Sequence, residues 1–164
     1  MDSFFEQIVK KKKGIKEWAI IVAVLLAALV LIALVWMFGI LAVIATVGIA
    51  YGAYWLMTTQ NVEFEYCVTN GDIDVDKIIA RRKRVRLVSV AGRKVRALAP
   101  YDPQKPLGKF QRTVMVAPSL NEQGLWYFTY HSKKNGDTLV VFRPDDRVLA
   151  AFYDGLPKRQ TEED

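Results

Sequence analysis

One uncharged segment constrains the whole chain: no Asp, Glu, Lys or Arg occurs from Trp18 to Met57, a run of 40 residues. A single helix of that length would be ~60 Å long, about twice the hydrocarbon core of a bilayer. The segment is therefore predicted to fold back near Trp36–Gly39 as an α-helical transmembrane hairpin, residues 18–57. Its two helices are expected over about residues 18–36 and 40–57.

Basic residues next to this segment predict its orientation. Five lysines, the last of them Lys16, precede the first helix, whereas the turn between the helices carries no charge. Positive residues stay on the cytoplasmic side of a membrane, so the protein is expected in the plasma membrane as a multi-pass protein with N- and C-termini cytoplasmic. Trp18 and Trp55 are expected at the membrane surface, where amphipathic aromatic rings collect.

Residues 1–17 are predicted to form a basic amphipathic segment that lies on the bilayer as an interfacial helix. Ser3 and Glu6 have capping-box spacing, and Phe4 and Ile8 recur at helical spacing. The alternative is a frayed basic tail that only sets the topology. The expected membrane-surface residues are Phe4, Ile8, Lys10, Lys11, Lys12, Lys13, Trp18 and Trp55.

Gly48 and Gly52 form a G-x-x-x-G spacing in the second predicted helix. Two positions without side chains on one face let another helix approach closely. The partner helix is either the first helix of the same hairpin or a helix of a second copy or another membrane protein.

Residues 58–157 are predicted to form a β domain. Val62–Thr69 alternates apolar and polar residues as a half-buried strand does, and Asn70-Gly71 indicates a hairpin turn after it. A C-terminal helix is expected over residues 144–155, because Pro144 suits its first turn and Gly155 its end. A disordered tail is expected at residues 158–164. The predicted strands are residues 62–69, 72–80, 84–90, 94–99, 112–117, 125–131 and 137–143.

Seven short strands followed by one helix resemble a pleckstrin-homology-like domain in topology. The predicted fold is thus the membrane hairpin plus a small antiparallel β-barrel or roll closed by a C-terminal helix. The segments MDSFFEQIVKKKKG, VEFEYCVTNGDIDVDKIIARRKRVRL and FRPDD also resemble an uncharacterised bacterial family of small two-helix membrane proteins, a domain-of-unknown-function family. That resemblance implies a bacterial plasma membrane and supplies no catalytic or ligand-binding residues.

A basic block without acids is the strongest polar signal in the sequence. It runs from Lys77 to Arg96, and cations held near a membrane gain roughly 1 kcal/mol each from anionic lipid. We therefore expect it to bind anionic phospholipid headgroups or an acidic partner. The alternative is ion pairing with the acidic face of the neighbouring strand. Nucleic acid is disfavoured because no nucleic-acid motif accompanies the charge. The candidate binding residues are Arg81, Arg82, Lys83, Arg84, Arg86, Arg93 and Lys94.

The sequence contains few residues that indicate catalysis or metal binding. Asp72, Asp74 and Asp76 resemble the opening of a calcium loop, but the required glycine and glutamate are missing. Cys67 and His131 lie in no catalytic motif. No enzyme activity, metal or cofactor is predicted.

These observations lead to two functional hypotheses. The first is a non-enzymatic membrane protein that presents its cytosolic domain as an interaction or anionic-lipid-binding module at the inner leaflet. The second is an accessory subunit of a larger membrane complex, or a homo-oligomer, that docks through the Gly48 and Gly52 face of the hairpin.

Overall fold

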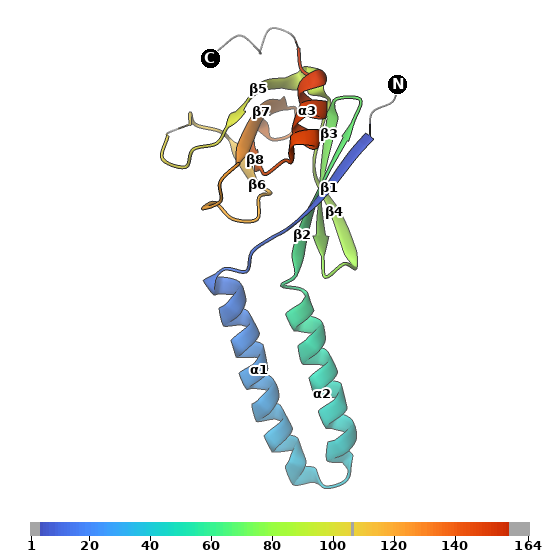
Figure 1. Cartoon of the computed structure of the whole chain (residues 1–164). Helices are drawn as coiled ribbons and strands as arrows, with labels where there is room; N and C mark the ends of the chain where they lie inside the picture. Colours follow the sequence, from blue (N-terminus) through green and yellow to red (C-terminus); the bar gives the residue numbers. More distant parts are fainter. Residues whose placement is uncertain (1–3, 106, 158–164) are drawn as a thin grey trace.

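A computed structural model of the chain describes residues 4–105 and 107–157. Two helices, α1 (Ile15–Val35) and α2 (Leu41–Thr58), lie antiparallel and project from one end of a β domain (Figure 1). A short 3-10 turn, η1 (Trp36–Phe38), joins them at the far tip, and Gly39 follows with φ 69°. Both helices are long and apolar enough to cross a membrane, by length and composition alone.

The two glycines of α2 differ in their surroundings, because Gly48 is exposed and Gly52 is half-buried. Ile21 of α1 and Ala42 and Ala53 of α2 are buried where the helices meet. A Cβ atom added at Gly48 or Gly52 would meet no atom within 4 Å. Gly52 nevertheless lines an apolar groove between the two helices, together with Val24 and Ala28 of α1, so packing of this face against the first helix stays a prediction.

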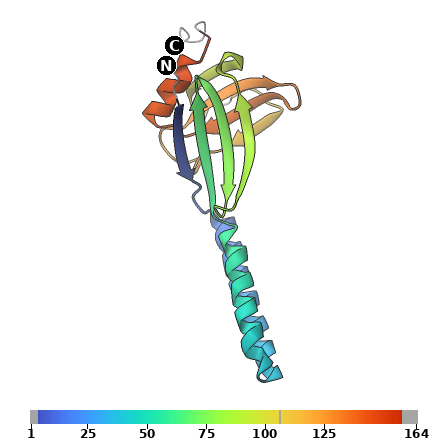
Figure 2. The same ribbon diagram turned by 90° about the vertical axis from the view of Figure 1, so that its right-hand side faces the viewer.

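The N-terminal segment is a strand. Both the predicted interfacial helix over residues 1–17 and its alternative, a frayed tail, are therefore wrong. Residues 1–3 lie outside the described part. Strand β1 (Phe4–Lys10) pairs antiparallel with β2 (Val62–Thr69) along its full length (Figure 2). The same residues alternate, so that Val9 packs on the core while Phe4 and Ile8 face outward. A complete strand ladder outweighs the ~1 kcal/mol that a helix cap supplies.

Two four-stranded sheets make up the β domain. The first has the order β1-β2-β3-β4, with β3 (Asp72–Ile79) and β4 (Lys83–Val90) continuing antiparallel from β2. The predicted Asn70-Gly71 turn joins β2 to β3, with φ of 52° and 83°. A 3-10 turn, η2 (Gly92–Lys94), leads from β4 to the second sheet.

The second sheet departs from the predicted antiparallel barrel. Its order is β5-β7-β8-β6, formed by β5 (Val95–Pro100), β6 (Arg112–Met115), β7 (Trp126–Ser132) and β8 (Gly136–Phe142). β6 pairs parallel with β8. No ladder joins the two sheets, so they form an open roll and not a closed barrel.

Helix α3 (Asp146–Asp154) packs against the first sheet at β1 and β2. The Asp145 side chain caps it by accepting a hydrogen bond from the Val148 amide at 2.8 Å. Val148 and Phe152 are buried, and the Phe152 ring meets Phe128 edge to face. The fully buried side chains of this core include Tyr66, Val68, Ile73, Val75, Phe128, Val140, Phe142, Val148 and Phe152.

The hairpin is thus an insertion within the β domain, between two paired strands. β1 precedes α1 and β2 follows α2, and both strands belong to one sheet (Figures 1 and 2). Gln7 also connects β1 to the end of the chain: its amide donates to the Arg143 carbonyl at 3.2 Å and accepts from the Asp145 amide at 2.8 Å. The domain therefore includes residues from both sides of the hairpin.

Candidate functional site

Three segments meet where the hairpin joins the β domain. Residues 11–14 connect β1 to α1, residues 59–61 connect α2 to β2, and the β3–β4 turn reaches the same end. The Lys11 amide donates to the Val62 carbonyl at 2.9 Å, and the Ala80 amide donates to the Asn61 carbonyl at 2.8 Å. These bonds hold the two connections and the turn side by side.

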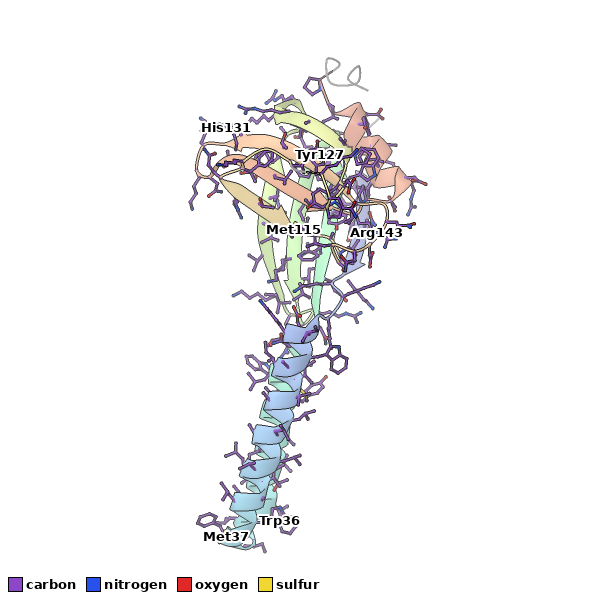
Figure 3. The ribbon with its side chains drawn as sticks, turned by 90° about the vertical axis from the view of Figure 1, so that its left-hand side faces the viewer. Trp36, Met37, Met115, Tyr127, His131 and Arg143 are labelled. Carbon is purple, nitrogen blue, oxygen red and sulfur yellow. The ribbon has the colours of Figure 1, made fainter. Side chains whose placement is uncertain are left out.

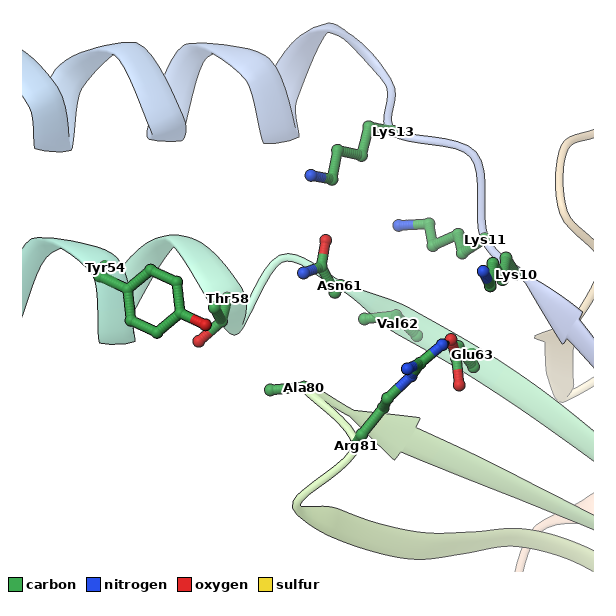
Figure 4. Close-up of a pocket in the computed structure, with 10 residues that line it drawn as sticks. All are labelled: Lys10, Lys11, Lys13, Tyr54, Thr58, Asn61, Val62, Glu63, Ala80 and Arg81. Carbon is green, nitrogen blue, oxygen red and sulfur yellow. The ribbon is translucent and has the colours of Figure 1, made fainter.

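A cationic cleft of about 470 Å³ lies at this junction (Figure 4). It presents four basic side chains and one acidic one, with a phenol, a hydroxyl and an amide as further hydrogen-bonding groups. A neighbouring cleft on the outer face of the first sheet shares Lys10, Glu63 and Arg81. Its further basic residues are Arg82, Lys83 and Arg84. The residues that line the junction cleft are Lys10, Lys11, Lys13, Tyr54, Thr58, Asn61, Val62, Glu63, Ala80 and Arg81.

The β3–β4 turn holds a strained backbone beside this cleft. Ala80 and Arg81 have φ of 52° and 56°, a region that costs non-glycine residues about 1 kcal/mol or more each. The turn at the opposite end of β3 uses Asn70-Gly71, the pair that such a conformation favours. The chain therefore places an arginine at the tip of the junction turn at a cost in stability.

Arg82 fixes the turn to the end of α2. Its guanidinium lies 5.3 Å from the centre of the Trp55 ring and donates to the Thr58 hydroxyl. A cation at this position also faces the negative end of the α2 dipole. Arg82 and Trp55 therefore hold the hairpin against the domain.

The lysines before α1 have different surroundings. Lys11 pairs with Glu17 at 2.5 Å, and the Lys13 ammonium lies 5.9 Å from the centre of the Trp18 ring. Lys12 instead points to the β6–β7 loop, where it pairs with Glu122 at 2.8 Å. Lys12 holds the pKa of Glu122 below its ordinary value. It thus contacts the domain and does not line the cleft.

Two of the predicted binding residues are in ion pairs on the sheet. Arg84 pairs with Glu65 at 2.7 Å, and Arg86 pairs with Asp76 at 2.7 Å and Asp74 at 2.8 Å. This matches the ion-pair alternative for Arg86, whereas Arg84 pairs with a carboxylate of β2 and not of the neighbouring strand β3. Burial raises the pKa of Glu65, and a hydrogen bond to a neighbouring carboxyl raises it further.

The remaining two predicted binding residues lie elsewhere. Arg93 and Lys94 belong to η2, beyond the end of β4 that lies opposite the junction. Eight residues of β4 at ~3.4 Å each put ~27 Å between the two ends. The predicted surface therefore divides into three groups, of which Arg81, Arg82 and Lys83 lie at the junction. Phe4, also predicted to lie on the membrane, pairs with Thr69 at the distal end.

The cleft residues Tyr54, Thr58, Asn61 and Glu63 were missed by the sequence reasoning. The only signal for them is their position at the helix–domain boundary, beside the lysines.

Cys67 and His131 do not come together. Cys67 lies on β2, within 3.8 Å of the Thr69 hydroxyl. His131 lies on the second sheet near the β7–β8 turn (Figure 3), with its Nδ1 2.7 Å from Asp137. His131 is the main cause that holds the pKa of Asp137 below its ordinary value. In residues 4–105 and 107–157 no group of three or more His, Cys, Asp or Glu side chains is placed to hold a metal ion.

Two packed sheets with a C-terminal helix, here carrying an apolar hairpin, define a pleckstrin-homology-like (PH-like) domain. Residues 1–162 match the family described as Bacterial PH-like domain (DUF6106), and the chain belongs to this family of unknown function. Searches of curated proteins and of solved structures gave no match. Membership is consistent with an interaction or lipid-binding module, and PH-like domains are generally non-catalytic.

Proposed function

We propose that this protein is an integral plasma-membrane protein whose PH-like domain binds anionic phospholipid headgroups at the inner leaflet, without enzyme activity. The observation that carries the proposal is the cationic cleft at the junction. It lies at the end of the domain from which both apolar helices leave (Figure 1).

The strand pairing supports the proposed topology. β1 and β2 belong to one sheet, so the segments before and after the hairpin must lie on the same side of the membrane. Two crossings satisfy this requirement. Lysines precede α1 and arginines follow α2, and this charge favours the cytoplasm for that side.

The expected position of the cleft relative to the membrane supports lipid as its ligand. Trp18 and Trp55 have exposed rings near the domain ends of α1 and α2, where an aromatic belt would sit. Only five residues lie between Trp55 and Asn61, which lines the cleft. The cleft would then lie at the level of the headgroups, where each cation gains roughly 1 kcal/mol from anionic lipid.

Native mass spectrometry of the full chain in detergent micelles tests this proposal. Phosphatidylglycerol and neutral phosphatidylcholine are titrated against the wild type and against a combined Lys10→Gln, Lys13→Gln and Arg81→Gln variant. The wild type should retain phosphatidylglycerol preferentially, and the variant should lose at least about tenfold in affinity.

A matched variant removes three cations far from the cleft. Combined Arg93→Gln, Lys94→Gln and Lys105→Gln changes should leave the preference for phosphatidylglycerol intact. Equal loss in both variants would mean that overall charge, not the cleft, attracts lipid. An unchanged preference in the cleft variant would refute the proposal.

A second candidate function is that of an accessory subunit docked through α2. The observation that favours it is the open space at Gly48, which is exposed and where an added Cβ would meet no atom within 4 Å. Small residues on a lipid-facing surface allow close helix packing. Gly48→Leu should abolish co-purification of a membrane partner or a second copy, whereas Ala50→Leu on the same helix should not.

A further inference from the structure

Among the residues that the structure describes, Glu63 is the only acidic one that lines the junction cleft. It lies on β2 directly opposite Lys10 of β1, and its Oε1 is 3.4 Å from Nε of Arg81. The Glu63 side chain is only 14% exposed, whereas that of Arg81 is 74% exposed. Figure 4 shows the Arg81 guanidinium turned toward Glu63 beneath the lysines.

The cations of the cleft differ in how far they are neutralised. Lys11 already has Glu17 at 2.5 Å, and Arg81 has Glu63. Among the described residues, no carboxylate lies within 4.0 Å of the ammonium groups of Lys10 or Lys13. A phosphate can therefore use these two lysines directly, but it reaches Arg81 only in competition with Glu63.

We propose that Glu63 is a specificity-determining residue of the cleft, which weakens the binding of doubly charged phosphate monoesters more than that of singly charged phosphodiester headgroups. This inference rests on the proposed lipid-binding function. Glu63 repels every bound anion, and Coulomb repulsion grows in proportion to the charge of the ligand. A second negative charge on the phosphate therefore doubles the penalty that Glu63 imposes.

The long Arg81–Glu63 contact allows a bound phosphate to replace Glu63 as the partner of Arg81. A separation of 3.4 Å exceeds the 2.7–2.9 Å of a strong charge-assisted hydrogen bond. A phosphate can thus take Arg81 without breaking a strong bond. Glu63 stays in place, because its backbone is paired on both sides, with β1 and with β3.

The test compares Glu63→Gln with the wild type in the full chain in detergent micelles at pH 8.5. Phosphatidylglycerol is the singly charged diester, and phosphatidic acid is the monoester, doubly charged at this pH. Removing a repelling charge ~6 Å away in aqueous surroundings gives about threefold per ligand charge. Phosphatidylglycerol should therefore bind about threefold tighter and phosphatidic acid about tenfold tighter.

Asp74→Asn is the matched control, because Asp74 lies on the outer face of the same sheet but not in the cleft. It should leave the affinity ratio of the two lipids unchanged. An unchanged ratio in Glu63→Gln, together with weaker binding of both lipids in Lys10→Gln with Lys13→Gln, would overturn this inference alone. If the lysine changes also have no effect, the proposed function fails as well.

A third arm separates lipid from soluble phosphate. Glycerol 3-phosphate carries the same monoester without acyl chains. It should not displace phosphatidylglycerol when added at the same concentration as the lipid. Displacement would mean that the cleft takes a soluble phosphate, and would overturn the assignment to lipid.

Discussion

Replacing Gln7 with alanine should destabilise the β domain, although Gln7 precedes the whole hairpin in sequence. The Gln7 amide donates to the Arg143 carbonyl at 3.2 Å and accepts from the Asp145 amide at 2.8 Å. Asp145 caps α3, so these bonds connect the first strand to the last helix. An interfacial helix or a frayed tail would predict no effect on the domain.

The expected magnitude follows from the two hydrogen bonds. Each contributes about 0.5–1.5 kcal/mol net. Gln7 is half-buried, so water can satisfy part of what the change exposes. The free energy of unfolding should fall by about 1–2 kcal/mol, which corresponds to an about 5- to 30-fold larger population of the unfolded state.

Amide hydrogen exchange of the full chain in micelles measures this change. Peptides from β2 and α3 should exchange faster in Gln7→Ala, whereas peptides from α1 and α2 should not. Gln104→Ala is the control, because Gln104 is exposed in the loop between β5 and β6. Unchanged exchange in β2 and α3 would refute the inclusion of β1 in the domain.

Three further predictions concern the domain and the junction turn. Gly155→Ala should cost about 2 kcal/mol or more in urea unfolding, because its Cβ would lie 2.3 Å from Cα of Gly71; an unchanged midpoint would contradict this contact. Burial raises the pKa of Glu65, so the folded protein holds the proton of this carboxyl more tightly than the unfolded chain does. The free energy of unfolding should therefore decline as pH rises from about 4.5 through the raised pKa. Glu65→Gln should remove that decline in unfolding measurements across pH, and the same decline in both proteins would argue against it. The double change Ala80→Asn with Arg81→Gly gives the turn the residues that its backbone favours, so the free energy of unfolding should rise by about 1–2 kcal/mol. The same change should weaken phosphatidylglycerol binding. A gain in stability without weaker binding would exclude Arg81 from the site.

Local sequence patterns were sufficient for most elements of the fold. Absence of charge over residues 18–57 predicted two apolar helices, and α1 and α2 occupy this region. Alternation and the Asn70-Gly71 turn predicted β2 and β3 because both signals arise between neighbouring residues. Pro144 and Gly155 predicted the ends of α3 for the same local reason, and the helix spans Asp146–Asp154 between them.

The failure at β1 has a specific physical cause. Phe4 and Ile8 share a face in a helix and also in a strand, because four residues fit both periods. The choice depends on the partner strand β2, which lies beyond the whole hairpin in sequence. No local pattern can report that pairing.

The candidate site was only partly predictable because sequence neighbours separate along a strand. Arg81 and Arg93 belong to one basic run, but β4 carries them to opposite ends of the sheet. Conversely, Lys10 and Arg81 are remote in sequence and line one cleft. Charge density along the chain indicated the chemistry, whereas strand direction decided which cations meet.

The insertion of the hairpin between paired strands makes the cleft a property of the whole chain. Lys10, Lys11 and Lys13 come from the entry side of the hairpin, and Arg81 comes from the domain that follows its exit. A fragment that begins at residue 58 would lack β1 and three of these four cations. Binding to anionic lipid should therefore be absent from such a fragment even where the full chain binds. The two helices then serve the site in two ways: they hold the domain at the membrane, and the chain entering and leaving them forms the walls of the cleft.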